Sequence, residues 1–366
     1  MQPCILYVHD LRSSGVVRNA LAYAERIAQD RPTTLLAGSA QGLFRREAGS
    51  GGFVLATLSD GAESPSRLAA ARHLRRWLSD RPGGVLLSVG NHGHPSVYWA
   101  TRGLPRFRRI YRISSQTERD GGLRDKVRLR WMAMLVADAD RIALVGDALS
   151  RTPFFARSLR DGKAAAIPNG LDRAAALRLA SAPSPHPWLE DAVPVVLGVG
   201  RLRPQKNFDL LIEAVGIARR ERRMRLAILG GGERRKREHL AGLAAEAGLG
   251  TDFLLAGETA NVFAWIARAH VFALPSRWEG SSMALLEALA VGTPAVASRL
   301  AGDAASVLGE GRHGLLFDGT DPAALAAALL HQTSDAPVRP GDRADQYGLS
   351  AERYAALVGE VDADDG

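Results

Sequence analysis

Short apolar runs alternate with longer amphipathic stretches along the chain, and this alternation constrains the fold more than any other feature. The apolar runs have the length of strands, and the stretches between them have the spacing of helices. This order is typical of repeated βαβ units around a parallel sheet, so we predict an α/β protein. The predicted strands of the first half are Ile5–Val8, Thr34–Ala37, Phe53–Ala56, Val85–Val89, Arg109–Ile113 and Arg141–Val145. Those of the second half are Val195–Val199, Leu226–Leu229, Phe253–Ala256, Val271–Leu274, Ala295–Ala297 and Gly314–Phe317.

A proline-rich segment divides these runs into two sets. The three prolines within residues 182–187 cannot continue a helix and favour an extended connector. The length of 366 residues also suits two domains better than one. We therefore predict an N-terminal domain over residues 1–177, a linker over 178–194 and a C-terminal domain over 195–345. A last helix within 346–366 is predicted to cross back to the first domain, and residues 362–366 are predicted to be a frayed acidic tail.

Charge and composition narrow the class of protein. The chain has 47 Lys and Arg against 39 Asp and Glu, a net charge of +8. This excess indicates an anionic partner, whether nucleic acid, an anionic membrane or a phosphorylated small molecule, or simply an arginine-rich composition. The single cysteine, Cys4, can form no internal disulfide, which fits a reducing cytosol. Because no run approaches a membrane span and residues 1–8 enter a strand without a basic leader, we expect a cytoplasmic protein.

A first group of candidate binding residues, Gly198–Asn207, comes directly after a predicted strand. Its glycines allow close backbone approach, while Arg201 offers a planar fork and Lys206 a point charge, a pair suited to a diphosphate. A dinucleotide fingerprint is disfavoured because Arg203 occupies the place of its third glycine. The glycines at 230–232 also follow a strand and, taken alone, favour a tight turn.

A second group, Pro275–Pro294, combines a loop with a helix predicted to begin near Met283 and to end before Gly292. Free N–H groups at the start of that helix can receive a phosphate. Glu279 in the loop can accept hydrogen bonds from sugar hydroxyls, and Glu287 on the helix can accept them from a diol such as ribose. The neighbours of Glu287 are apolar, so a carboxylate buried among them needs polar partners.

These segments resemble the retaining GT-B glycosyltransferases of family 4. The likeness is carried, in order, by IPNGLD at 167–172, Gly200-Arg201-Leu202 with Lys206, the glycines at 230–232, Glu279 and Glu287 in EGSSMALLEALAVGTP, and GLLFD at 314–318. It covers nearly the whole chain. The segment Val8–Asn19 is similar to the family's glycine-rich first loop and keeps Gly15, although Ser13 and Ser14 replace two glycines and Val17 replaces a glutamate. The resemblance implies a GT-B fold, with two Rossmann-like domains facing across a crevice.

The resemblance also implies roles for individual residues. Arg201 and Lys206 would hold the donor's diphosphate and neutralise the charge that develops as it leaves. Glu279 would contact the transferred sugar, and Glu287 would hold the nucleoside ribose. The remaining donor-binding positions implied are Gly15, Gly200, Gly257, which lies near the expected place of the base, Gly280, Ser281, Ser282 and Met283.

Two histidines follow the predicted strand Val85–Val89, where the family often carries a histidine that contacts the donor sugar or places the acceptor. His92 is nearer the strand end and is our first choice for this role, with His94 as its rival and as an acceptor candidate. Arg112 follows the next strand and could serve the acceptor or a phosphate, although a surface role suits it equally.

Two other motifs point elsewhere at first sight. Asp138-Ala139-Asp140 matches the DxD motif of metal-dependent transferases, but it continues a helical run, so we predict no metal. The basic run Arg234–Arg237 is most simply a solvated helix face, with contact to an anionic membrane as the alternative. Aromatic residues interleaved for base stacking are missing, so nucleic acid is not expected as a partner.

The function predicted is that of a retaining, metal-independent hexosyltransferase. It would move a sugar from a nucleotide-diphosphate donor, UDP- or GDP-linked, to a hydroxyl of a glycan or lipid-linked acceptor. No cofactor is expected, and polysaccharide or glycan-lipid biosynthesis at the inner membrane face is the implied setting. Two alternatives stay open: a nucleotide-sugar epimerase of GT-B fold, and a non-catalytic basic module that binds membrane or nucleic acid.

Overall fold

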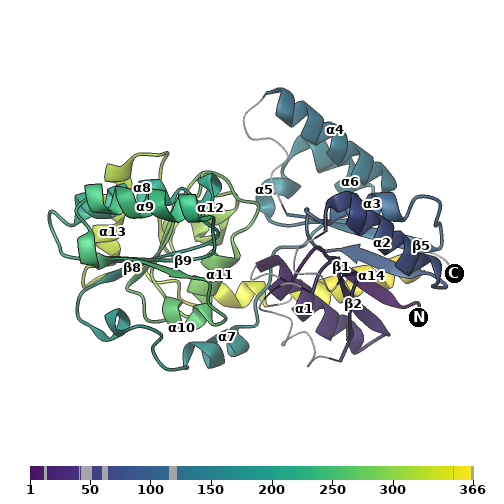
Figure 1. Ribbon diagram of the computed structural model, residues 1–366, viewed down its shortest axis with the longest axis horizontal. Helices are drawn as coiled ribbons and strands as arrows, with labels where there is room; N and C mark the ends of the chain where they lie inside the picture. The colour runs from purple at the N-terminus through teal and green to yellow at the C-terminus, as the bar shows by residue number, and fades with distance from the viewer. Residues whose placement is uncertain are drawn as a thin grey trace. The chain divides into compact units, whose positions relative to one another are not determined.

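The computed structural model describes residues 1–11, 15–40, 42, 52–59, 65–114, 122–348 and 350–363. The chain forms two compact units, each an α/β structure (Figure 1). Unit 1 comprises residues 1–170 and 349–366, and unit 2 comprises residues 171–348. The segment 178–194, for which a connector is predicted, lies inside unit 2, where it includes the end of a helix and a short 3-10 turn.

Unit 1 contains a parallel sheet in the order β3-β2-β1-β4-β5-β6-β7. Its strands are β1 (Cys4–Val8), β2 (Thr33–Ala37), β3 (Val54–Thr57), β4 (Gly84–Ser88), β5 (Phe107–Ile113), β6 (Arg141–Leu144) and β7 (Ala164–Ala166). Its helices are α1 (Gly15–Ala28), α2 (Arg67–Ser79), α3 (His94–Ala100), α4 (Leu123–Asp138), α5 (Asp147–Ser150), α6 (Ala156–Arg160) and α14 (Ser350–Ala363). Alternate residues of β1 enter separate clusters, because α1 and α14 cover one face of the sheet while α2, α3 and α4 cover the other.

Unit 2 repeats this architecture with a sheet in the order β10-β9-β8-β11-β12-β13. Its strands are β8 (Val195–Val199), β9 (Arg225–Leu229), β10 (Phe253–Gly257), β11 (Val271–Leu274), β12 (Ala295–Ser298) and β13 (Leu315–Phe317). Its helices are α7 (Arg173–Ala180), α8 (Phe208–Ala218), α9 (Arg234–Glu246), α10 (Val262–Ile266), α11 (Met283–Ala290), α12 (Ala304–Val307) and α13 (Pro322–Gln332). The α/β prediction is confirmed in both units, and each predicted strand is present with small shifts at its ends.

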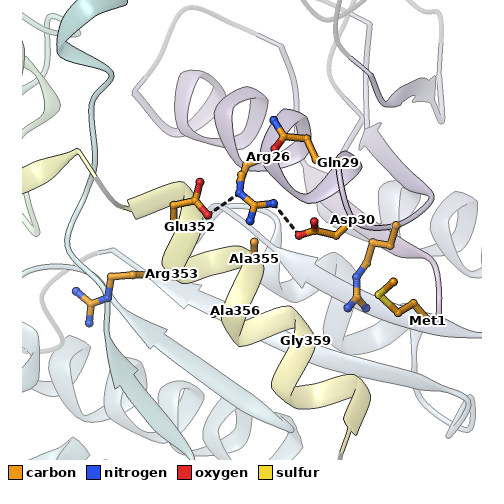
Figure 2. Close-up of a pocket in the computed structure, with 10 residues that line it drawn as sticks. Met1, Arg26, Gln29, Asp30, Glu352, Arg353, Ala355, Ala356 and Gly359 are labelled. Carbon is orange, nitrogen blue, oxygen red and sulfur yellow. Dashed lines mark hydrogen bonds and ion pairs between the residues drawn. The ribbon is translucent and has the colours of Figure 1, made fainter.

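The C-terminal helix α14 packs on α1 within unit 1. The rings of Tyr23 and Tyr354 stack 4.1 Å apart, and Arg26 bridges Glu352 and Asp30 (Figure 2). Asp362, expected in a frayed tail, instead pairs with Arg31 at 3.2 Å. Residues 364–366 lie outside the described part of the chain. A surface groove of about 830 Å³ runs between the two helices, and none of the predicted site residues lines it.

Candidate functional site

In unit 2 the candidate site lies at the point where the strand order reverses. β8 and β11 are neighbours, although β9 and β10 come between them in the sequence. Helices crossing from these two strands go to opposite faces of the sheet, which leaves room for a ligand beyond their carboxyl ends. The loops after β8 and β11 hold the two groups of residues singled out above, and both therefore reach the same edge of the sheet.

An ion pair joins these two loops. The Nζ atom of Lys206 lies 2.7 Å from Oε1 of Glu279, and the two side chains are only 17% and 10% exposed. Ser276 donates its hydroxyl to the same oxygen at 2.8 Å, while Nε2 of Gln205 donates to Oε2 at 3.2 Å. Glu279 is thus held from both loops, and a carboxylate so shielded from water needs these partners.

Gln205 and Ser276 were not predicted as site residues. Both side chains are polar and uncharged, so their residue type gave no reason to select them. Each lies, however, in a loop that directly follows one of the two central strands, β8 and β11. That position was the available signal, because side chains after β8 and β11 converge whatever their type.

Two glycines make room for this arrangement. At Gly200, with a φ of +154°, an added Cβ would lie 2.6 Å from Cε of Lys206. At Gly230, with a φ of +146°, it would lie 1.9 Å from the backbone oxygen of Gly200. The glycines at the ends of β8 and β9 therefore allow the loops to pack together and let the lysine stem cross the end of β8.

The other predicted donor-binding residues of unit 2 lie in or next to the segments that carry Lys206 and Glu279. Arg201 follows Gly200 and has an exposed side chain, whereas Glu287 on α11 is fully buried. Gly280, Ser281 and Ser282 precede α11, whose first residue is Met283 as predicted; Ser282 is the N-cap but makes no side-chain capping bond. Gly257, with a φ of +77°, ends β10 at a bulge.

In unit 1 the strand order reverses between β1 and β4, and a histidine follows each of these strands. The rings of His9 and His92 meet edge to face with centroids 4.3 Å apart. His92 is exposed, and its Nδ1 lies 3.0 Å from Nη2 of Arg67. His9 was not predicted, although its place directly after β1 is the same signal that pointed to His92. Gly15 begins α1, while Ser13 and Ser14 lie outside the described residues.

His94 and Arg112 occupy the interior of unit 1 instead of a binding surface. Each is 1% exposed. The ring nitrogens of His94 bond to Ser88 Oγ at 2.7 Å and to the backbone oxygen of Arg112 at 3.2 Å. Arg112 donates to the backbone oxygen of Val89 and to Asn169. These contacts hold strand ends together, and an acceptor role for either residue stays a prediction.

The same burial changes the acid–base behaviour of His94. Desolvation is the largest cause and lowers the pKa of the ring to about 3, and the nearby charge of Arg112 acts in the same direction. The hydrogen bond to the backbone oxygen opposes the shift. His94 is therefore a neutral imidazole at physiological pH.

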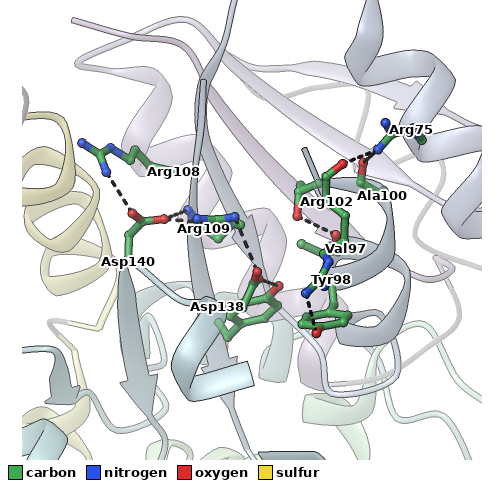
Figure 3. Close-up of polar contacts among 11 residues, drawn as sticks. Arg75, Val97, Tyr98, Ala100, Arg102, Arg108, Arg109, Asp138 and Asp140 are labelled. Atoms are coloured by element: carbon green, nitrogen blue, oxygen red, sulfur yellow. Dashed lines mark hydrogen bonds and ion pairs between the residues drawn. The ribbon is translucent and has the colours of Figure 1, made fainter. Parts of the chain in front are cut away.

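The DxD-like segment is part of the packing of unit 1. Asp138 ends α4 and accepts a hydrogen bond from the Tyr111 hydroxyl at 2.7 Å, while Asp140 pairs with Arg108 and Arg109 (Figure 3). Arg109 also lies 3.5 Å from Asp138, so both carboxylates have an arginine partner on β5. Among the residues that the structure describes, no cluster of three histidine, cysteine or acidic side chains could hold a metal ion.

These features define an α/β protein of GT-B fold. Over the full length of both chains, the structure is similar to HepE of Anabaena in complex with UDP-glucose, with a TM-score of 0.77 and 17% identity. It is also similar to the α,α-trehalose 6-phosphate synthase of Burkholderia multivorans, with a TM-score of 0.76, 16% identity and full coverage of both chains. The expected fold is confirmed.

The sequence of unit 2 is similar to a known family. Residues 193–335 match the family model described as Glycosyl transferases group 1. This segment includes Lys206, Glu279 and Glu287.

Two curated relatives are similar to less than half of the chain. The D-inositol 3-phosphate glycosyltransferase 2 of Catenulispora acidiphila is 35% identical over 175 residues, 45% of this chain and 40% of its own length. The GDP-mannose-dependent alpha-(1-6)-phosphatidylinositol monomannoside mannosyltransferase of Mycolicibacterium smegmatis is 34% identical over 172 residues, 44% of this chain and 43% of its own. The alignments thus span about two fifths of these relatives.

Proposed function

We propose that the chain is a retaining, metal-independent glycosyltransferase that moves a sugar from a nucleotide-diphosphate donor to an acceptor hydroxyl. The observation that carries the proposal is the Lys206–Glu279 pair, at 2.7 Å, where the strand order reverses in the segment that matches the group 1 family model. A cation and a carboxylate side by side suit a ligand that has a diphosphate next to a polyhydroxyl ring.

Within this proposal each residue has a role. The Lys206 ammonium and the Arg201 guanidinium bind the diphosphate, and Glu279 accepts hydrogen bonds from the sugar. Amides of residues 280–283 contact sugar and phosphate, Glu287 holds the ribose, and the base lies near Gly257. Gln205 and Ser276, which already bond to Glu279, orient its carboxylate. In unit 1, Gly15 serves the donor, and His92 contacts the donor sugar or places the acceptor.

The reaction requires no protein nucleophile. The acceptor oxygen attacks the anomeric carbon from the face that the diphosphate leaves, and the bond from that carbon to the phosphate oxygen breaks. The departing phosphate oxygen takes the acceptor's proton, while Lys206 and Arg201 stabilise the charge that develops on the diphosphate. We propose no cofactor besides the donor.

The setting is also a proposal. The names of the relatives include a GDP-mannose-dependent mannosyltransferase of a phosphatidylinositol mannoside, and HepE was solved with UDP-glucose. These names support a UDP- or GDP-linked donor and a glycan or lipid-linked acceptor. The cytoplasm, at the inner membrane face, is the setting we propose. No helix in the described part of the chain is long and apolar enough to cross a membrane.

A thermal-shift screen against UDP, GDP, UDP-glucose and GDP-mannose tests the proposal. A ligand that binds only the native state adds about 2.7 kcal/mol of stability at a hundred times its dissociation constant. We expect one nucleotide series to raise the melting temperature of the unaltered protein and to have little effect on Lys206→Ala. No response to any of the four would refute the donor site. A separate incubation of the protein with the donor alone tests the alternative, since conversion of the donor sugar without acceptor would favour an epimerase.

A further inference from the structure

Helix α4 exposes large apolar side chains on the face that points away from the core of unit 1. Leu123 is 77% exposed, Val127 65% and Met134 37%. These positions are spaced by four and seven residues, so they form one stripe along the helix. The opposite face carries Met132 and Leu135, which are buried in the core. A contiguous apolar stripe on an exposed face marks a candidate interaction surface.

The charges of α4 are sorted between these faces. Its two acidic residues are turned away from solvent: Asp125 is 4% exposed and pairs with Arg128, and Asp138 faces Arg109 (Figure 3). Lys126 and Arg130 lie one turn apart among the exposed apolar residues, and neither is ion-paired with a carboxylate in the part of the chain that the structure describes. The described side chains of this exposed face are therefore apolar or cationic.

Exposed apolar and aromatic side chains also lie beside α4. The exposed residues Ala133 and Ala137 line a recess of about 470 Å³ together with Phe154 and Lys163, and the one carboxylate in its lining, Asp161, pairs with Arg157. The ring of Trp131 contacts Tyr98 on α3, which in turn contacts Trp99, and Trp99 is 53% exposed. Tryptophan side chains are favoured where an apolar phase meets water.

We propose that this α4 face, made of Leu123, Lys126, Val127, Arg130 and Met134, docks on the surface of an anionic lipid bilayer. The apolar side chains would enter the head-group region, and the two cations would lie against lipid phosphates. Charge complementarity carries the choice of occupant, since a protein partner would have to be acidic and apolar over the same few residues. The proposal does not depend on the sugar chemistry of unit 2.

The basic run of α9 is a weaker candidate for the same role. Arg234 pairs with Glu238 on its own helix, and Lys236 pairs with Asp209 at 3.0 Å. Its carboxylate partners oppose an anionic surface, and no exposed large apolar residue accompanies the run in the described part of the chain. The two surfaces are separable by mutation.

Vesicle flotation of the full chain tests the proposal, with phosphatidylcholine vesicles that contain or lack phosphatidylglycerol. We expect binding to the anionic vesicles only, weakened by salt. Lys126→Gln with Arg130→Gln should lower the partition coefficient about fivefold for each cation removed. Leu123→Ser with Val127→Ser should also lower it. Two control pairs should bind like the unaltered protein: Leu177→Ser with Leu179→Ser on exposed α7, and Arg235→Gln with Arg237→Gln on α9.

A second measurement labels an introduced cysteine, because Cys4, the chain's own single thiol, is fully buried. A polarity-sensitive dye on Met134→Cys should shift to the blue with anionic vesicles, whereas the same dye on Leu177→Cys should not. Equal binding to neutral vesicles, no binding at all, or unchanged binding by both α4 variants would overturn the proposal. A loss of vesicle binding confined to the α9 variant would place the membrane-binding site on α9. Self-association of the protein that is abolished by Leu123→Ser with Val127→Ser would assign the α4 face to a second copy of the chain.

Discussion

The ammonium of Lys206 lies 2.7 Å from Oε1 of Glu279, although the two residues follow different strands. Each loop holds the carboxylate through a further residue, since Gln205 and Ser276 also donate to Glu279. The pair is largely shielded from water, which strengthens its attraction relative to a surface ion pair. A cation fixed in this way is oriented before a diphosphate arrives.

Removal of the cation should slow transfer sharply. Lys206→Ala is expected to lose about 2 to 4 kcal/mol of transition-state stabilisation, because it removes the ammonium that is held beside Glu279. The measurement is release of nucleoside diphosphate from the donor found in the thermal-shift screen. Lys236→Ala, which removes a lysine paired with Asp209 on the same unit, is the matched control and should leave turnover unchanged. Near-normal turnover in Lys206→Ala would contradict the diphosphate assignment.

A methyl group at Gly200 should displace the lysine without removing it. In Gly200→Ala the new Cβ would lie 2.6 Å from Cε of Lys206, so the flexible stem must move. We expect turnover to fall, together with a loss of about 1 to 3 kcal/mol in unfolding free energy from the unfavourable φ. Gly242→Ala is the control: its Cβ would meet nothing within 4 Å in the middle of α9, so it should stabilise by about 0.5 to 1 kcal/mol. Equal turnover in the two variants would argue against the role of Gly200.

The proposed ribose contact can be tested by neutralising Glu287. Glu287→Gln keeps the volume of this fully buried side chain and removes its charge. Loss of a hydrogen bond to a charged group should weaken nucleoside diphosphate binding by about 1.5 to 3 kcal/mol. Isothermal calorimetry measures this directly, with exposed Glu246→Gln as the control. Unchanged affinity in Glu287→Gln would exclude the ribose role.

The buried ring of His94 should make stability depend on pH. The unfolded chain takes up a proton at this histidine near pH 6.5, whereas the folded protein does not until its pKa of about 3. The unfolding free energy therefore falls as pH decreases below 6.5, by at most about 1.4 kcal/mol per pH unit from this group.

The variant His94→Gln isolates this contribution. It should be less stable at pH 7.5, because the bonds to Ser88 and to the backbone of Arg112 are disturbed, and its deficit should shrink between pH 6.5 and pH 5. Urea unfolding of the full chain at several pH values gives the comparison, with exposed His73→Gln as the control. A deficit that stays constant with pH would show that His94 titrates normally.

Local pattern predicted much of the fold and the loops of the candidate site. Helix α11 begins at Met283 and ends at Ala290, as its capping and apolar pattern indicate, and Lys206 and Glu279 both follow predicted strands. Strand β7 was missed because Ala164–Ala166 consists of three alanines, which favour a strand weakly. Its place at the sheet edge comes from pairing with β6.

The sequence by itself determined the strands, the helices between them and the loops that carry chemistry, because spacing and capping act over a few residues. Only the tertiary structure decided which loops meet, since the strand order brings Lys206 to Glu279 and His9 to His92. The tertiary structure also showed how His92 and His94 differ, although both follow β4. His92 is exposed, whereas α3 begins at His94 and turns its ring into the core. Burial and long-range pairing depend on the packing of the whole unit, which no local pattern encodes.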